Sequence, residues 1–297
     1  MKPYLDLVRE VLAKGTRKPN RTGVDTLSTF NVNYEIDLRQ GFPLLTTKEI
    51  SWKNIVVENL WFLSGDTHIG LLKKHGCKFW DPWADDGGRV PSAYGNFWRH
   101  FPVHGAPGEG EARAAYNDQI AWVVEELKRN PMSRRLVVSA WAPGNAQTSK
   151  LPPCHLLFAL NVQYDERGEP MLCLHLTQRS ADVALGVPYN IAGYALLLEL
   201  FARFAGLRAG LFAHTLVDAH VYTAKPDGSM AEYDHVPGLR KQLEREPRPL
   251  PRLAISPAIR RLEDLTALLH ADTSAIMEHF VLTGYDPHPA IAFKVAV

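Results

Sequence analysis

The sequence predicts an α+β fold in which helices pack against one large mixed β-sheet. Helical and strand-like patterns interleave without the regular strand–helix alternation of a doubly wound sheet, and no internal repeat is visible. Three strand-like stretches follow one another in the middle of the chain and lead into a long apolar helix. Since 46% of the 297 residues are hydrophobic and no segment resembles a linker, we expect a single domain over 1–297.

The first part of the chain predicts a helix, a pair of strands and a second helix. Apolar residues near the N-terminus repeat at helical spacing, and the repeat stops at Gly15. Residues 21–38 then alternate as a strand pair would. A helix is expected over 51–66 with Ser51 as its N-cap, and it brings the carboxylate of Glu58 close to an apolar face. A carboxylate in that position suggests a chemical role.

The rest of the chain alternates between apolar stretches of helical and of strand-like spacing. Residues 101–116 are rich in glycine, alanine, proline and charge, and we expect them to form a surface insertion. A proline-rich turn is expected over 245–253. The remaining expected elements are helices at 118–130 and 191–206 and strands at 134–141, 155–164, 171–179 and 211–222.

Charge and cysteine content exclude several classes of protein. Lys+Arg 33 against Asp+Glu 32 leaves a net charge of +1, so no overall field attracts nucleic acid or a membrane surface. Cys77, Cys154 and Cys173 show no close pairing, and no apolar run reaches the ~18 residues of a membrane span, so a cytoplasmic protein is expected. No paired Cys or Cys–His spacing accompanies the 12 histidines, and no metal site is expected.

Cys154 stands between a proline pair and a histidine in the stretch LPPCH. A cysteine at the head of a strand is usually a small buried hydrophobe, but a thiol becomes a nucleophile where positive charge stabilises its thiolate. Arginines occur at the ends of the expected strands and in a glycine-containing turn. Adjacent arginines often form only a solvated face, yet their planar forks also suit phosphate recognition. The candidates for such a site are Arg21, Arg134, Arg135, Arg179 and Ser180.

Two further polar residues have competing interpretations. His155 follows the cysteine directly, but adjacent residues on a strand point to opposite faces, so a Cys–His hydrolase pair is not expected. Asn190 stands where a helix opens. It is either a helix cap or an amide that pairs with the imide edge of a uracil ring.

A series of short motifs runs along nearly the whole chain. In order, they are RTG, GFPLLTTK, WFLSGDT, FWDPWAD, YGNFWR, SRRLVVSAW, LPPCH, QRSAD, LGVPYNIAGYALL, DAHVY, REPRP and the final AV. Together they resemble thymidylate synthases of the folate-dependent type. The resemblance implies reductive methylation of deoxyuridylate (dUMP) to thymidylate (dTMP), with 5,10-methylenetetrahydrofolate as the one-carbon and hydride donor and dihydrofolate as the second product.

The resemblance implies a role for each candidate near the nucleotide. Cys154 adds to C6 of uracil, which makes C5 nucleophilic, while Glu58 relays protons through ordered water and Tyr94 takes part in removing the C5 proton. The implied catalytic set is Cys154, Glu58, Tyr94, Arg179, Asp182 and Asn190. The implied nucleotide-binding set is Arg21, Arg134, Arg135, Arg179 and Ser180 at the 5′-phosphate, Asn190 at the pyrimidine amide edge, and His220 and Tyr222 at the sugar 3′-hydroxyl, together with Asp182.

The resemblance also implies a folate site and a closing C-terminal tail. Closure protects the exocyclic methylene intermediate from water until hydride reaches it. Glu49 and Ile50 stand where many relatives are more basic, which predicts weaker binding of folate polyglutamates, and Ala224 and Lys225 depart from the usual residues after DAHVY. The implied folate-side residues are Trp80, Trp83, Asp182 and Gly186, with the tail up to Val297.

The resemblance further implies a homodimer in which two sheet faces pack together and Arg134 and Arg135 reach the partner's phosphate. The closest alternative is a pyrimidine nucleotide hydroxymethylase of the same fold, in which water captures the intermediate. Trp80 argues against it because its indole shields that carbon, and Asn190 in place of aspartate argues against a cytosine substrate. A secondary RNA-binding role stays open, although neither the charge nor an aromatic–basic platform indicates one.

Overall fold

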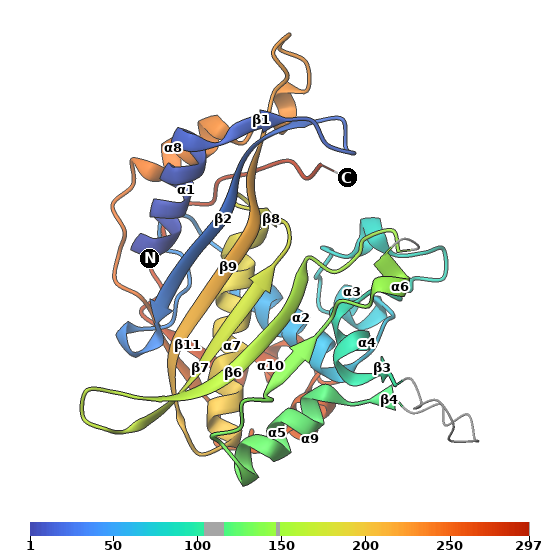
Figure 1. Cartoon of the computed structure of the whole chain (residues 1–297), viewed down its shortest axis with the longest axis vertical. Coiled ribbons are helices and arrows are strands. Elements are labelled where there is room, and N and C mark those ends of the chain that lie inside the picture. Colours follow the sequence, from blue (N-terminus) through green and yellow to red (C-terminus); the bar gives the residue numbers. More distant parts are fainter. Residues whose placement is uncertain (104–115, 147–148, 297) are drawn as a thin grey trace.

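The structure is a computed structural model that describes residues 1–103, 116–146 and 149–296. Its centre is a mixed sheet, which confirms the expected α+β class (Figure 1). The sheet has the order β1 (Thr16–Lys18), β2 (Asp25–Asp37), β9 (Arg208–Thr223), β7 (Pro170–Gln178), β6 (His155–Tyr164) and β5 (Val137–Ser139), with β8 (Ala181–Asp182) also paired to β9. β9 is parallel to β7 and β8, and the other pairs are antiparallel.

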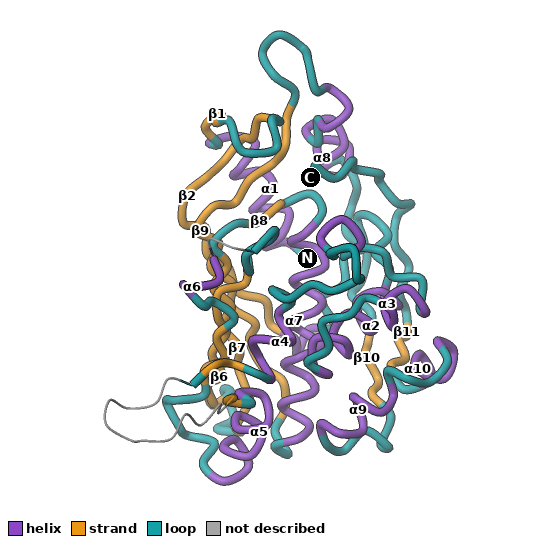
Figure 2. The backbone as a smooth tube through the Cα atoms, turned by 90° about the vertical axis from the view of Figure 1, so that its right-hand side faces the viewer, coloured by secondary structure: helices purple, strands orange, loops and turns teal. Residues whose placement is uncertain are grey.

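Helices cover one face of this sheet, as Figure 2 shows from the side. The central helix α7 (Gly186–Phe204) is buried over most of its 19 residues, which explains why its sequence is apolar nearly all round. Among the described residues, no helix is both long and apolar enough to cross a membrane. The other helices are α1 (Lys2–Lys14), α2 (Trp52–Ser64), α3 (Gly70–Lys74), α4 (Tyr94–Arg99), α5 (Gln119–Arg129), α6 (Pro143–Ala146), α8 (Val236–Leu243), α9 (Leu262–Leu268) and α10 (Thr273–Glu278).

Helix α2 begins and ends as its local sequence predicts. The Ser51 hydroxyl accepts a hydrogen bond from the backbone N–H of Asn54 (3.4 Å). Gly65 ends the helix with φ 75°, in the left-handed region that favours glycine. Glu58 therefore lies in the middle of a well-defined helix whose remaining face is largely apolar.

The strand pair expected over 21–38 is wrong in its detail. The structure has one long strand, β2, which pairs with the short preceding strand β1. The side chain of Asn20 forms the turn between them, because its Oδ1 accepts hydrogen bonds from the backbone N–H (2.9 Å) and hydroxyl (2.7 Å) of Thr22. Arg21 lies in this turn rather than in a strand.

The face of the sheet that points away from the helices is uncovered along its central strands in the described part of the chain (Figure 2). Outward side chains on β9, such as Leu211, Ala213 and Val217, are half-buried and alternate with fully buried neighbours. Thr215 links three strands on this face, since its hydroxyl donates to Asn33 (2.6 Å) and lies 2.9 Å from Nε2 of His175. A partly apolar, uncovered sheet face is typical of an interaction surface.

Two excursions leave the compact body. β3 (Phe101–Pro102) pairs with β4 (Tyr116–Asn117) at the base of the insertion expected over 101–116, of which residues 104–115 lie outside the described residues. The second excursion, residues 224–234, leaves the end of β9, and the backbone N–H of His235 then donates to the carbonyl of Tyr222 (3.0 Å). The chain thus returns after the excursion, and His235 lies beside Tyr222, the last residue of the DAHVY motif. A small sheet of β10 (Arg252–Ile255) and β11 (Phe280–Thr283) completes the fold.

Candidate active site

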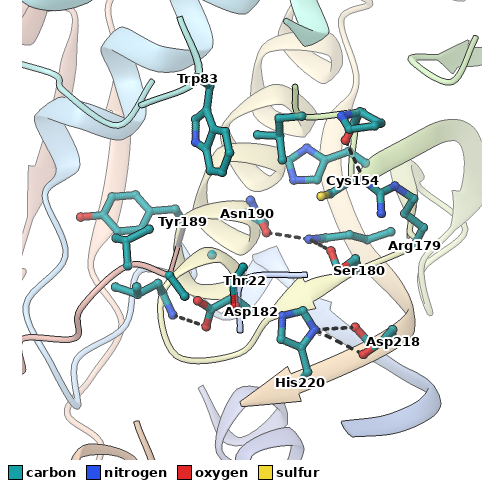
Figure 3. Close-up of a pocket in the computed structure, with 18 of the residues that line it drawn as sticks. Thr22, Trp83, Cys154, Arg179, Ser180, Asp182, Tyr189, Asn190, Asp218 and His220 are labelled. Atoms are coloured by element: carbon teal, nitrogen blue, oxygen red, sulfur yellow. Dashed lines mark hydrogen bonds and ion pairs between the residues drawn. The ribbon is translucent and has the colours of Figure 1, made fainter. Parts of the chain in front are cut away.

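A cavity of about 550 Å³ gathers most of the predicted site residues (Figure 3). This volume is typical of a site that encloses a small molecule. Segments that are distant in sequence line it: the turn before β2, helix α2, the end of β7, the start of α7, β9 and the C-terminal tail. The predicted residues in its lining are Arg21, Glu58, Trp80, Trp83, Tyr94, Cys154, Arg179, Ser180, Asp182, Gly186, Asn190, His220 and Tyr222.

Two of the predicted residues that the structure describes are not part of this lining. Arg134 and Arg135 lie at the head of β5, where both side chains are exposed. Val297 lies outside the described residues. The cavity of one chain is thus built without the adjacent arginine pair.

Cys154 precedes β6 and is held by its backbone. Its N–H donates to the hydroxyl of Tyr94 (3.2 Å), and its carbonyl accepts from the N–H of Arg179 (2.9 Å). Burial raises the pKa of the thiol, whereas the positive charges of Arg179 and Arg21 lower it. These two cations are therefore the groups that favour a thiolate at this position.

Arg179 also shapes the loop that carries the thiol. Its guanidinium donates to the carbonyls of Pro152 (2.7 Å) and Pro153 (2.9 Å). Arg21 comes from the turn before β2, and its guanidinium carbon lies 5.7 Å from the centre of the Trp83 ring. Together with Ser180, these side chains form a basic part of the cavity that suits a phosphate group.

His155 forms no pair with the neighbouring thiol. Its ring is buried, stacks on Tyr94 with ring centres 4.4 Å apart, and places Nδ1 3.2 Å from the hydroxyl of Tyr194. Burial lowers the pKa of His155 to about 3 although Asn190 opposes the shift, so the ring is neutral at physiological pH. Cys154 lies just before β6 and His155 is the first residue of that strand, and the described contacts of the His155 ring are with Tyr94 and Tyr194 rather than with the thiol.

Glu58 projects from α2 into the cavity and is bound by an indole. Nε1 of Trp80 donates to its Oε1 at 2.7 Å. Burial raises the pKa of Glu58 from 4.5 to about 7, while the hydrogen bond from Trp80 acts in the opposite direction. The carboxyl group is thus poised to take up and release a proton near neutral pH.

Asn190 is not the helix cap, so that interpretation is wrong: α7 already begins at Gly186, one turn earlier. The amide is oriented instead by a chain of side chains. Nε2 of Gln178 donates to Oδ1 of Asn190 (3.2 Å), and Oε1 of Gln178 is 3.0 Å from Nε2 of His214. The hydroxyl of Tyr34 lies 2.7 Å from the other ring nitrogen of His214. This order of donors leaves the Asn190 amino group available to the cavity.

His220 and Tyr222 lie on β9 with Asp218, which the sequence interpretation did not assign. Nδ1 of His220 is 3.3 Å from the Asp218 carboxylate, as Figure 3 shows, and that carboxylate also binds Lys18 and the Ser28 hydroxyl (2.9 Å). Burial would raise the pKa of Asp218, but the hydrogen bonds from His220, Lys18 and Ser28 outweigh it and hold the pKa well below its usual range. Asp218 is therefore an anion that keeps a proton on Nδ1 of His220.

The opposite wall of the cavity is aromatic and apolar. Trp80 and Trp83 contribute to it, and the rings of Phe79 and Tyr189 meet edge to face with centres 4.9 Å apart. Oδ1 of Asp182 accepts hydrogen bonds from two backbone N–H groups in the turn that follows it, those of Ala184 (2.9 Å) and Leu185 (3.0 Å). Val295 and Ala296 of the tail complete this side.

Comparison with known proteins identifies the family. A family model described as thymidylate synthase matches residues 2–297. A curated thymidylate synthase from Haloferax volcanii is 43% identical over 350 aligned positions, which cover 99% of this chain and 96% of that protein. The chain belongs to the thymidylate synthase family. It is a methyltransferase that converts dUMP to dTMP, and this assignment does not favour the alternative of a hydroxymethylase.

Members of this family use methylenetetrahydrofolate as a co-substrate. The described residues contain no group of three or more His, Cys, Asp or Glu side chains that is arranged to hold a metal ion. The sequence interpretation missed several lining residues. The available signal for four of them was their place inside quoted motifs: Asp218 in DAHVY, Gln178 in QRSAD, Phe79 in FWDPWAD and Tyr189 in LGVPYNIAGYALL. Nothing local to its position marks Lys18.

Proposed function

We propose that dUMP and methylenetetrahydrofolate react in this cavity, with Cys154 as the nucleophile. The observation that carries the proposal is that the thiol lies in one cavity with two cations that favour its thiolate, Arg21 and Arg179, and with an oriented amide, Asn190. A phosphate needs the cations and a pyrimidine needs the amide. A pyrimidine nucleotide can bind the cations through its phosphate and the amide through its base, and this places the base beside the thiol.

The base is recognised by Asn190. Uracil presents an N3–H donor and an O4 acceptor, and the amide offers an acceptor and a donor in the matching order. Because Gln178 already donates to Oδ1 of Asn190, the amide does not gain by turning over. A cytosine amino group meets the amide's own amino group in this orientation, which disfavours cytosine.

The reaction begins when the Cys154 thiolate adds to C6 of uracil, and the electron pair of the C5–C6 double bond moves to C5 and O4. C5 then bonds to the methylene carbon of the folate and loses its proton, and the bond from that carbon to the folate nitrogen breaks, which frees tetrahydrofolate inside the cavity. Hydride from tetrahydrofolate reduces the exocyclic methylene as the Cys154–C6 bond breaks, which gives dTMP and dihydrofolate. Glu58, with its pKa of about 7, is the carboxyl group suited to move these protons through water.

Tyr94 is proposed to orient that water. Burial raises the pKa of its hydroxyl far above the usual value, so the phenol keeps its proton at neutral pH. Its oxygen accepts from the backbone N–H of Cys154, and its own hydrogen remains available for a water molecule. The tyrosine therefore acts beside the C5 proton as a hydrogen-bonding group.

The folate is proposed to occupy the aromatic side of the cavity. Trp80 and Trp83 supply flat apolar surface, Gly186 leaves room beside Asp182, and Val295 and Ala296 of the tail line the cavity. We propose that the tail up to Val297 closes over the ligand. Exclusion of water matters because the methylene intermediate is electrophilic. We propose that His220 and Tyr222 bind the sugar 3′-hydroxyl on the other side.

We also propose that the chain acts as a single domain in a cytoplasmic homodimer. The uncovered sheet face offers the surface, and Phe30 of β2 is 81% exposed. Arg134 and Arg135, which are exposed and outside the cavity lining, are proposed to complete the phosphate site of the partner. Symmetry makes that exchange reciprocal.

The test of the proposal follows dihydrofolate formation by absorbance with each substrate alone and with both together. Absorbance is expected to rise only with both, and Cys154→Ala should abolish the rise while calorimetry still detects dUMP binding. Cys173→Ala is the matched control, because that thiol lies outside the cavity lining. Turnover by Cys154→Ala would refute the assignment of the nucleophile.

A further inference from the structure

The end of the chain is contacted by an excursion that the proposed mechanism does not use. Residues 224–234, which we call the clamp loop, leave β9 and project from the fold at the end where the C-terminus lies (Figure 1). Inside the loop, the N–H of Lys225 donates to the carbonyl of Ser229 (2.9 Å), and Gly228 adopts φ 81°. A short 3₁₀ turn, η3 (Ala231–Tyr233), then leads to His235.

Two side chains of the clamp loop contact Lys294 in the tail. The Lys294 ammonium lies 3.5 Å from the Glu232 carboxylate and 4.2 Å from the centre of the Tyr233 ring. The charged groups are about half exposed, and contacts of this kind are weak because water screens them. They bias the position of the tail without being sufficient to hold it.

The stronger contact is buried and comes from His235, which is 1% exposed. Its Nε2 lies 2.9 Å from the carbonyl oxygen of Lys294, and since a carbonyl only accepts, Nε2 carries the hydrogen. The same ring packs against Phe293, with ring centres 5.0 Å apart. His235 thus binds the tail through both its edge and its face.

His235 also touches the cavity. Its ring centre is 5.6 Å from that of Tyr222, and its Nδ1 lies 3.9 Å from Oδ1 of Asp182. That Nδ1 is buried and has no hydrogen-bond partner in the described structure. The imidazole is therefore wedged between the tail and two side chains of the cavity lining.

We propose that His235 is a positioning residue which, with the clamp loop, holds the C-terminal tail over the folate side of the cavity. The inference rests on the proposed function, in which the tail covers the ligands. Val295 and Ala296, which line the cavity, come directly after the carbonyl that His235 binds. Ordering a flexible tail costs conformational entropy, and a tail that is already held spares folate binding part of this cost.

The test compares His235→Leu with His235→Gln, because the glutamine amide still donates where Nε2 did. For His235→Leu we expect the KM for methylenetetrahydrofolate to rise about tenfold and hydrogen exchange of residues 291–296 to accelerate, with the Kd of dUMP unchanged within about twofold. His235→Gln should restore most of both effects. Equal losses of dUMP affinity and folate KM, or unchanged exchange in the tail, would overturn the proposal.

A surface variant keeps the test decisive if His235→Leu fails to fold. Glu232→Gln combined with Tyr233→Leu should accelerate exchange in the tail and raise the folate KM by about threefold, while Glu244→Gln, an exposed change at the end of α8, should alter neither. An effect of the control equal to that of the double variant would also overturn the proposal. Exchange is measured without turnover, so a failure of the proposed function appears separately, as absence of dihydrofolate from the unaltered protein.

Discussion

The indole N–H of Trp80 donates to the Glu58 carboxyl group at 2.7 Å, and both residues line the cavity. The pairing joins α2 to the segment before α4. One hydrogen bond to a carboxylate lowers its pKa, but burial is the larger effect, and the pKa of Glu58 rises to about 7. The same residue thus links protein stability and chemistry to pH.

Glu58→Gln should change the pH dependence of stability. Between pH 4.5 and 7 the folded protein holds a proton on Glu58 that the unfolded chain has released, so the free energy of unfolding falls as the pH rises through this window. The fall approaches about 3 kcal/mol from this residue alone. Urea unfolding measures the free energy of unfolding of both proteins at pH 5 and pH 8. The unaltered protein should lose more stability between these pH values than the neutral glutamine variant does. If the free energies of unfolding of the two proteins change equally with pH, the raised pKa of Glu58 is contradicted.

Asp218→Asn should weaken the recognition of the sugar hydroxyl. The Asp218 anion keeps the hydrogen on Nδ1 of His220, which leaves Nε2 as an acceptor for a hydroxyl donor. We expect kcat/KM for dUMP to fall about tenfold and that for its 3′-deoxy analogue to change little. In a His220→Ala background, Asp218→Asn should have no further effect on the ratio of kcat/KM for dUMP to kcat/KM for the 3′-deoxy analogue. An equal loss for both substrates would show that Asp218 has only a structural role.

Arg179→Gln should make the Cys154 thiol less reactive. Removing the guanidinium charge raises the pKa of Cys154 further, while the glutamine amide still donates to a proline carbonyl. Alkylation of Cys154 by iodoacetamide at pH 7, followed by mass spectrometry, should slow by about threefold to tenfold. Arg208→Gln, which loses an ion pair with Asp165 outside the cavity lining, is the matched control. An unchanged rate would remove Arg179 from the set of activating cations.

Mixed dimers should reveal whether the arginine pair acts in trans. Homodimers of Cys154→Ala and of Arg135→Glu are each expected to be inactive, yet a mixed dimer has one site with both defects and one site with neither. After the two variants are unfolded and refolded together, about half of the dimers are mixed and roughly a quarter of all sites are intact. Activity should reappear to that extent. Activity at the level of separately refolded controls, despite mixed dimers in the mass spectrum, would place Arg135 in its own subunit's site or in none.

Local features of the chain were predictable because they depend on neighbours in sequence. Ser51 caps α2 through an N–H three residues away, and Gly15 ends the repeat of α1. Pattern and order of motifs likewise pointed to the sheet, to Cys154 and to the family. The strand pair over 21–38 failed because a single side chain, Asn20, sets the turn at the very start of that stretch, which leaves the rest as one long strand.

Orientation was decided only by the tertiary structure. The place of Asn190 in sequence is compatible with a cap or with a base-binding amide, but α7 starts earlier and Gln178 of β7 orients the amide toward the cavity. His235 reaches the end of β9 only because the clamp loop closes, and its contact with Lys294 joins residues far apart in the chain. The sequence by itself determined which chemical groups and local elements this protein has. Which atom of each group faces the ligand depends on hydrogen bonds and burial between distant segments, and these exist only once the chain has folded.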